Sequence, residues 1–587
     1  MRPTLKRKAK TMFRENNTHK QLAWISNVKD FPEKRQKRLA ESWSGVFYRE
    51  FFCRIDEQAF AVLYADMPSR PNMPVNVLLG LEALKAGFGW SDEELHDNFI
   101  FDVQVRYALG YHQLGEGEFE LRTLYNFRQR VVKHLNETGE NLIEKAFEQV
   151  TDEQVKAYQL KTGKLRMDST QIASNICETT RLRLLVEVLQ RTHRMLDETD
   201  QEHYADSFEP FLKGQAGQYA YRVKPGESGV HLERIGLLMH QLVAELADKY
   251  GEERSYRILQ RVFTEHFVLE GKDSLRPKAG QELSASSLQS PDDEQASYRR
   301  KRGKDYRGYV ANVTETCDPE NDLQLVTKVQ IAPNSTEDAQ LLAEALPNLQ
   351  ERTELNELHT DGGYSSEEVD EALVEMKVDQ VQTAIKGAKP DPDTLRLEDF
   401  KWQISDQGKP TSVTCPNGVK ARVIAGRSQD RYLAYFSLQD CEGCPFAADC
   451  PAKPLKRRPK RALRFSSKQQ QVARRRQLSA QAKANGKNLR AAVEATVRSV
   501  KHPFRNGKVP VRGQPRVSML LIGSAAMTNV RRIYRYLQDK NKLESQKKNQ
   551  KSPSDQPVFH FFDRTSHFFS TFLTFSTPRA AEPAFPN

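Results

Sequence analysis

The chain has 587 residues, of which 38% are hydrophobic and 28% are charged. This composition is typical of a globular protein, and the length suffices for roughly two to four domains with a sizeable core. The longest apolar run, residues 517–527, is about half the ~20 residues that a spanning helix needs, so we expect no membrane contact. The basic N-terminus has no apolar segment behind it, so we expect no secretory signal. The seven cysteines, an odd number, favour free thiols in a reducing cytoplasm.

The net charge of +11 is unevenly distributed along the chain. Lys and Arg are densest in residues 453–476, and Glu494 is the only acid between Cys450 and Gln538. A basic stretch of this length favours a nucleic acid partner, because each phosphate that a cation neutralises releases a counterion. The alternative is a solvated surface that only aids solubility.

Residues 1–155 are predicted to form a helical domain, because apolar residues recur there at helical spacing. The last of its clear helices displays Arg122, Arg128 and Arg130. Small helical clusters with exposed arginines often bind DNA, although helical bundles without a ligand are at least as frequent. Both interpretations stay open for this domain.

A second domain, residues 156–538, is predicted to have an α/β fold. Its β-rich segments alternate with amphipathic helices in the order β, β-hairpin, α, β, α, β, which is typical of a mixed sheet. The predicted strands are residues 164–168, 308–317, 323–333, 357–361 and 379–385. We expect a helical insertion at residues 178–300, a small Cys-containing β insertion at 388–475, and a disordered tail at 539–587.

Two aspartates, Asp168 and Asp361, each close a predicted strand and are followed by small polar residues. Functional groups gather at the carboxyl ends of strands in open sheets. Each aspartate also has an ordinary interpretation, because Asp before Gly is a common turn residue and Asp before Ser-Thr can cap a helix.

The third acid, Glu494, lies in a predicted amphipathic helix over residues 488–502 that ends before Pro503. Arg490, Arg498 and Lys501 share its helical stripe. Glu494 is therefore either one half of an i,i+4 ion pair or a metal-binding carboxylate on a surface that binds a polyanion. Three carboxylates can hold two Mg²⁺ ions roughly 3.5–4 Å apart, a pair suited to phosphoryl transfer.

In these segments the sequence resembles the DDE transposases of bacterial insertion sequences, in particular the IS-eleven-eighty-two group. RMDST at residues 166–170 and HTDGGYSS at residues 359–366 are similar to the first two motifs of the family. Arg490, Glu494 and Lys501 match the third motif of related transposases, Y-x2-R-x3-E-x6-K, whereas Lys487 stands at its Tyr position. The N-terminal helical domain is also similar, and the resemblance covers residues 40–538.

The resemblance implies an RNase H-like catalytic domain that cleaves element ends with Mg²⁺ and transfers the freed 3′-OH to target DNA. It implies that two Mg²⁺ ions are held by the three acids, Asp168, Asp361 and Glu494. The predicted DNA-binding residues are Lys487, Arg490, Arg498 and Lys501. The implied partners are double-stranded DNA, both element ends and target, and further copies of the chain in a homo-oligomer.

Two other functions stay open. One is a transposase-derived DNA-binding protein that no longer cuts, and the other is a metal-dependent nuclease without strand transfer. No G-x-x-x-x-G-K-[ST] phosphate loop is present, which disfavours an ATP-driven regulator. We expect the protein in the bacterial cytoplasm, associated with the nucleoid.

Four cysteines, Cys415, Cys441, Cys444 and Cys450, lie close together in the sequence. Cys441 and Cys444 form one C-x2-C knuckle, and the outer two could complete a structural Zn²⁺ site with four thiolates. The alternative is reduced thiols that pack a small β insertion. A catalytic role is not expected, because four thiolate ligands leave no open position.

Overall fold

The computed structural model divides into a unit of residues 1–536 and a second unit of residues 537–587. The structure describes residues 13–20, 26–65, 72–113, 115–176, 180–224, 226–270, 275–301, 303–383, 394–405, 408–428, 430–484 and 488–550. No helix in these ranges is long and apolar enough to cross a membrane.

The N-terminal region is helical, as predicted. Helix α3 is buried on every side, from Val75 to Gly87, because the apolar part of the C-terminal helix α19 (Gln514–Gln550) packs directly against it. A Cβ atom at Gly523 would lie 2.9 Å from the Ala86 Cβ, so the two helices approach closely at this point. The helices are α1 (Glu33–Ala40), α2 (Trp43–Glu50), α3 (Val75–Phe88), α4 (Asp92–Phe101), α5 (Val103–Ala108), α6 (Leu121–Thr138) and α7 (Leu142–Ala157).

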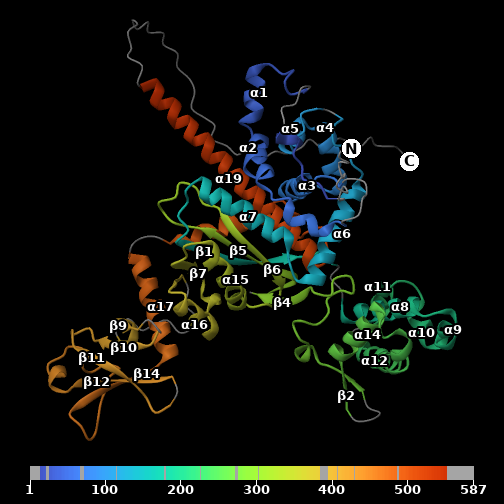
Figure 1. The fold of residues 1–587 in the computed structure, drawn as a ribbon. Coiled ribbons are helices and arrows are strands. Elements are labelled where there is room, and N and C mark those ends of the chain that lie inside the picture. The colour runs from blue at the N-terminus through green and yellow to red at the C-terminus, as the bar shows by residue number, and fades with distance from the viewer. Residues whose placement is uncertain are drawn as a thin grey trace, which may run out of the picture. The chain divides into compact units, whose positions relative to one another are not determined.

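A mixed sheet follows, with the strands in the order β6-β5-β1-β7-β8 and β4 paired to the start of β5 (Figure 1). Strand β5 is antiparallel to β1 and β6, whereas β7 is parallel to both β1 and β8. This order and orientation agree with the predicted RNase H-like α/β fold. The strands are β1 (Lys164–Ala173), β4 (Ser297–Lys301), β5 (Lys304–Thr316), β6 (Val326–Pro333), β7 (Glu357–Thr360) and β8 (Asp379–Gln382).

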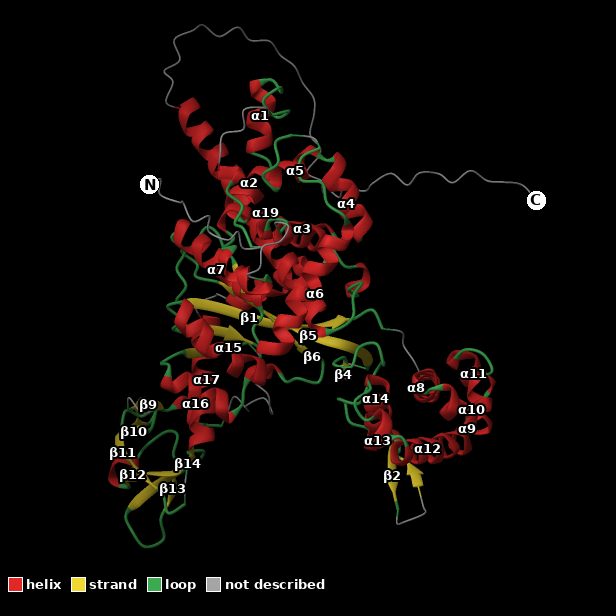
Figure 2. Ribbon diagram, turned by 45° about the vertical axis from the view of Figure 1, so that its right-hand side comes forward, coloured by secondary structure: helices red, strands yellow, loops and turns green. Residues whose placement is uncertain are grey.

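Helices cover both faces of this sheet (Figure 2). On one face, α15 (Asp338–Arg352) and α16 (Glu367–Glu375) form a core with Leu165 and Met167 of β1. On the other face lie α18 (Val493–Lys501) and the first part of α19. Because side chains alternate along a strand, Arg166 and Asp168 point away from the core of α15 and α16 and toward α18.

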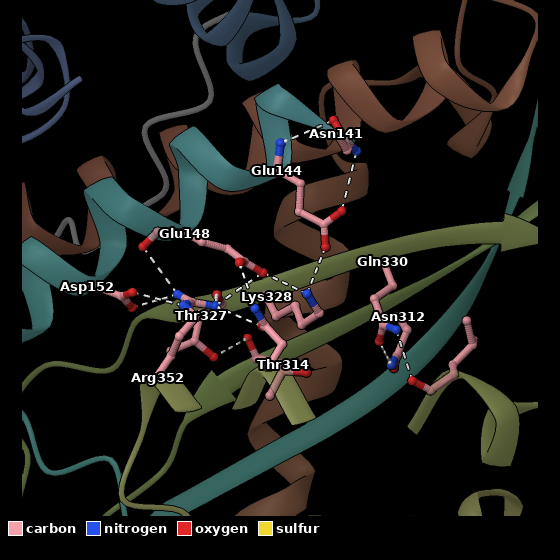
Figure 3. Close-up of polar contacts among 12 residues, drawn as sticks. Asn141, Glu144, Glu148, Asp152, Asn312, Thr314, Thr327, Lys328, Gln330 and Arg352 are labelled. Atoms are coloured by element: carbon pink, nitrogen blue, oxygen red, sulfur yellow. Dashed lines mark hydrogen bonds and ion pairs between the residues drawn. The ribbon is translucent and has the colours of Figure 1, made fainter. Parts of the chain in front are cut away.

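The helical region and the sheet are joined by a cluster of charges with little exposure (Figure 3). The Lys328 Nζ on β6 lies 2.8 Å from Glu144 and 2.7 Å from Glu148, both on α7. Arg352 on α15 pairs with Asp152 at 2.6 Å and with Glu148 at 3.2 Å. Charge-assisted hydrogen bonds therefore fix α7 to β6 and α15, which lie far from it in the sequence.

The predicted helical insertion is present and has its own apolar core. Its end was predicted wrongly, because residues 297–301 form β4, which pairs back onto β5 after a turn in which Gly303 has φ +76°. A short hairpin of β2 (Phe267–Leu269) and β3 (Leu275–Pro277) also belongs to it. Its helices are α8 (Arg181–Met195), α9 (Glu198–His203), α10 (Ala205–Leu212), α11 (Ala216–Arg222), α12 (Ser228–Glu245), α13 (Ala247–Tyr250) and α14 (Arg254–His266).

The Cys-containing insertion is a six-stranded sheet with the order β13-β14-β12-β11-β10-β9 and a separate core. It ends earlier than predicted, at Ser466, because α17 (Ser467–Ala484) begins there and returns to the first sheet, where Arg474 pairs with Asp379 at 2.6 Å. Its strands are β9 (Lys401–Ile404), β10 (Pro410–Thr414), β11 (Lys420–Ala425), β12 (Arg431–Ser437), β13 (Lys453–Pro454) and β14 (Lys460–Ser466).

Two predictions near the C-terminus need correction. The predicted helix over residues 488–502 is split into a 3-10 turn, η8 (Leu489–Ala492), and α18. The predicted disordered tail begins too early, because α19 continues to Gln550. The last part of this helix contains many Lys, Gln, Leu and Glu residues, which favour helices. Residues 551–587 of the predicted tail lie outside the described residues.

Candidate active site

The three predicted acids lie around a single guanidinium group, that of Arg490. Its Nη2 is 3.1 Å from the Asp168 Oδ1 and 3.9 Å from the Asp361 Oδ2. Its Nη1 is 3.8 Å from the Glu494 Oε1. The structure thus brings together residues from β1, the end of β7 and the first turn of α18.

Strand β1 places Asp168 on the face that meets α18. Three alternate residues of this strand contact the segment that contains Glu494: Arg166 donates to the Leu489 carbonyl at 2.8 Å, Asp168 accepts from Arg490, and Thr170 accepts from Lys501 at 3.1 Å. The prediction that Asp168 closes its strand is wrong, because the long strand β5 keeps β1 paired as far as Ala173. The parallel pairing with β7, however, ends before Asp168, at Arg166.

Asp361 uses its two carboxylate oxygens differently. The Oδ1 accepts a hydrogen bond from the Gly363 N–H at 2.7 Å and caps a 3-10 turn, η5 (Gly362–Tyr364). The Oδ2 faces Arg490. A Cβ atom at Gly363 would lie 2.9 Å from the Asp361 Oδ1 and 2.8 Å from the Asp338 Oδ2, so only glycine fits this turn without a shift. Asp361 is therefore a turn residue, as its ordinary interpretation predicts, and its second carboxylate oxygen still faces Arg490.

Glu494 is the most open of the three acids, with 56% of its side chain exposed. Its helix buries Val493, Thr496, Val497 and Val500 against the sheet, which leaves Glu494 on the outer side. The i,i+4 ion pair with Arg490 predicted as the ordinary alternative is also present.

At this site, burial and the neighbouring charges shift the pKa values of Asp168 and Arg490 in opposite directions. Burial raises the pKa of the Asp168 carboxyl above its usual value, and the neighbouring Arg490 offsets part of this rise. Burial disfavours the Arg490 cation, but the neighbouring carboxylates, Asp168 first and then Asp361 and Glu494, together outweigh burial and raise the pKa of Arg490. Arg490 therefore stays charged, and its charge keeps Asp168 closer to ionisation than burial alone would allow.

The predicted DNA-binding residues have different surroundings. Arg490 faces the acids, and the Lys501 Nζ donates to the Thr170 hydroxyl and to the Gln171 carbonyl at 2.8 Å, so both are directed at the protein itself. Burial lowers the pKa of Lys501. Arg498 is exposed, and Lys487 lies outside the described residues.

One neighbour of the site was not predicted. Arg490 also donates to the Thr383 hydroxyl at 3.5 Å, and Thr383 directly follows β8. Because β7 and β8 are adjacent and parallel, their carboxyl ends meet at one edge of the sheet. Thr383 lies near the end of the predicted strand 379–385, and this position was a signal that could have identified it.

The donor set has the chemistry that Mg²⁺ requires. Mg²⁺ is bound in proteins by one or two carboxylates together with water and substrate phosphate oxygens, and the site offers three carboxylates with no soft ligand among the residues described above. The guanidinium of Arg490 now lies between them, and among the described residues no three His, Cys, Asp or Glu side chains form a ready-made metal site.

The four predicted zinc ligands line one small pocket in the β insertion, together with Phe400 and Phe436. Cys441 and Cys444 close a tight turn in which Gly443 has φ +73°, and the turn after Cys415 contains Gly418 with φ +84°. Burial raises the pKa of the Cys441 thiol, and the three other thiols act in the same direction. All four cysteines are free thiols, Cys415, Cys441, Cys444 and Cys450.

Comparison with known proteins gives one match, to the family described as the transposase DDE domain, over residues 414–534. The matched segment contains Glu494, Arg490 and the four cysteines, and lies after Asp168 and Asp361 in the chain. No curated protein and no solved structure matches. Residues 414–534 are thus similar to a transposase DDE domain, and this similarity supports a DNA-transposing enzyme.

Proposed function

We propose that the protein is a DDE-type transposase of a bacterial insertion sequence, of the IS-eleven-eighty-two kind, that cleaves element ends and joins the 3′-OH to target DNA. The observation that carries the proposal is the meeting of Asp168, Asp361 and Glu494 around Arg490. Three acids from separate elements would repel one another unless a cation lay between them.

The proposed chemistry is phosphoryl transfer. Two Mg²⁺ ions, when bound by Asp168, Asp361 and Glu494, would supply activation of the attacking oxygen and stabilisation of the leaving oxygen. Arg490 would exchange its carboxylate partners for a phosphate group of the DNA, because a guanidinium can donate two parallel hydrogen bonds to two oxygens of one phosphate. Its buried Nε has no hydrogen-bond partner among the described residues, so its present contacts leave part of its donor capacity unused.

The first experiment is the substitution Glu494→Gln, assayed for Mg²⁺-dependent cleavage of DNA that carries the element end. We expect cleavage to fall at least about 100-fold, because a neutral amide cannot replace a metal-binding carboxylate, while DNA binding stays measurable. Glu351→Gln, an exposed acid on α15, is the matched control and should cut as the wild type does. Equal cleavage by Glu494→Gln and wild type would show that Glu494 has no role in the reaction.

The same assay separates the alternatives. A DNA-binding protein derived from a transposase would bind the element end without cutting it, and a nuclease would cut without joining a precut 3′-OH end to target DNA. Because two ends must be cut and joined together, we propose that the protein acts as a homo-oligomer on double-stranded DNA. We also propose that the helical N-terminal domain binds element ends.

We propose in addition that Cys415, Cys441, Cys444 and Cys450 hold a structural Zn²⁺. Their common pocket and tight turns support this. The side chains would have to move to bring the four sulfurs to about 2.3 Å from one ion, because no three such groups among the described residues are now placed to hold one. We expect one zinc per chain by elemental analysis, and its loss in Cys444→Ser. Cys53→Ser, an exposed cysteine outside the insertion, is the control. Protein purified under reducing conditions without zinc, yet with normal stability, would refute the site.

A further inference from the structure

A fourth carboxylate lies behind the three acids and has no exposure to solvent. This is Glu315 on β5, the cross-strand partner of Arg166 on β1. Its Oε1 accepts from the Arg166 Nε at 2.6 Å, and its Oε2 accepts from the Thr496 hydroxyl at 2.7 Å and from the Arg532 Nη1 at 2.6 Å. Arg532 also donates to the Thr496 hydroxyl. Both carboxylate oxygens of Glu315 therefore accept hydrogen bonds from buried or part-buried partners.

The partners of Glu315 lie beside the acids in the sequence. Arg166 is two residues before Asp168 on the same face of β1, and its Nη1 donates to the carbonyl of Leu489, which precedes Arg490. Thr496 is two residues after Glu494 on α18, and is itself fully buried. The cluster thus joins the strand of one acid to the helix of another, and Arg532 adds α19.

Stability alone does not explain such a cluster. A buried ion pair contributes little compared with well-packed apolar residues of the same size, because desolvation offsets the attraction. What charge-assisted hydrogen bonds do provide is fixed geometry, because they are short and directional. At a metal site, partners behind the ligands commonly serve this purpose.

We propose that Glu315 is a positioning residue that acts through Arg166 and Thr496 to set the separation of Asp168 and Glu494. This inference rests on the proposed function, because the separation matters for holding a pair of divalent ions. Glu315 itself does not touch DNA or metal. Thr496 is the best residue to substitute in a test of this proposal, because its hydroxyl makes the hydrogen bond between α18 and Glu315.

The test replaces Thr496 in the full-length protein. Thr496→Val keeps the shape of the side chain and removes the hydroxyl, and Thr496→Ser keeps the hydroxyl. The matched control is Thr192→Val on α8, where the hydroxyl is equally buried but bonds only to the Val188 carbonyl within its own helix. The measured quantities are the thermal midpoint and the affinity for Mn²⁺, the latter by electron paramagnetic resonance with DNA absent.

We expect Thr496→Val to weaken Mn²⁺ binding about 10- to 100-fold, with a thermal midpoint close to that of Thr192→Val, and Thr496→Ser to restore the affinity. Glu315→Gln should weaken Mn²⁺ binding at least as much. Wild-type affinity in Thr496→Val would overturn the inference and leave the proposed function standing. If instead Glu494→Gln binds Mn²⁺ as wild type does, the metal site is elsewhere and both proposals fail.

Discussion

We expect Arg490 to have two roles that depend on whether metal ions and DNA are present at the site. Within 4 Å it meets three carboxylates, and it is the group that now offsets their mutual repulsion. Divalent cations that bind the same carboxylates must displace it. We therefore expect Arg490 to weaken metal binding before DNA arrives and to assist the reaction afterwards, which couples metal binding to the presence of substrate.

This coupling gives a prediction for Arg490→Gln. In the absence of DNA its affinity for Mn²⁺ should rise on the order of tenfold, because a competing positive charge is removed from the site. Cleavage of element-end DNA should fall, because the phosphate contact is lost. Titration with Mn²⁺ checks the first effect, and Arg505→Gln, an exposed arginine of the same segment, is the control. Unchanged or weaker Mn²⁺ binding would contradict the competition.

Single residues were predicted from the sequence with uneven success. Asp168, Asp361 and Glu494 were predicted to lie together, and the structure places all three within 4 Å of Arg490, whereas their catalytic role stays a prediction. The surroundings of Lys501 and Arg128 were not predictable, because they depend on long-range contacts: Lys501 bonds to β1, and Arg128 on α6 is held by Glu82 at 2.6 Å instead of being displayed to solvent. A helical stripe shows which residues share a face, but not what that face meets.

At the scale of elements, α3 and α19 cross in close contact. Gly523 brings the backbone of α19 against α3, where a Cβ atom would be 2.9 Å from the Ala86 Cβ and 3.2 Å from the Glu82 carbonyl. Neither neighbour is the end of a flexible side chain. The helices would have to move apart to admit even a methyl group.

We therefore expect Gly523→Ala to lower the free energy of unfolding by about 1–3 kcal/mol, as overpacking of a core does. Gly229→Ala is the matched control, because Gly229 is also helical but has open space around it, so alanine there should be neutral or slightly stabilising. Chemical denaturation of both variants measures the two free energies of unfolding and checks this prediction. Equal stability of the two would mean that the α3–α19 contact yields easily.

Elements were predicted better than their ends. The five principal strands and the two insertions follow from alternation, helical periodicity and turn residues. The predicted ends are wrong where pairing with another strand changes the length of an element. Strand β1 continues past Asp168 because β5 pairs with it, and residues 297–301 form β4 because they make a hairpin with β5. For β1, the partner strand lies too far along the chain for local patterns to reveal it.

At the scale of the whole molecule, the basic surface predicts a strong dependence of DNA binding on salt. We expect the logarithm of the binding constant for double-stranded DNA to fall linearly with the logarithm of salt concentration, with a slope on the order of −5. Removing three exposed cations of the β insertion, at residues 456–458, should make the slope shallower by up to about 3.

The control for this measurement removes three exposed cations of the helical insertion, Lys213, Arg222 and Lys224, and should leave the slope unchanged. Binding titrations between about 50 and 200 mM salt give both slopes. A slope near zero for the wild type would mean that the excess of lysine and arginine does not meet phosphates.

The burial of α3 by α19 has a consequence for synthesis on the ribosome. The apolar helix Val75–Phe88 is made early, but the helix that covers it begins only at Gln514. A nascent or prematurely terminated chain therefore exposes the apolar surface of α3, and chaperones and proteases recognise such surfaces. Arg490 and Glu494 are also synthesised late, so an unfinished chain lacks both the third acid and the helix that completes the hydrophobic core. We therefore expect incomplete translation products to be degraded before they can damage DNA.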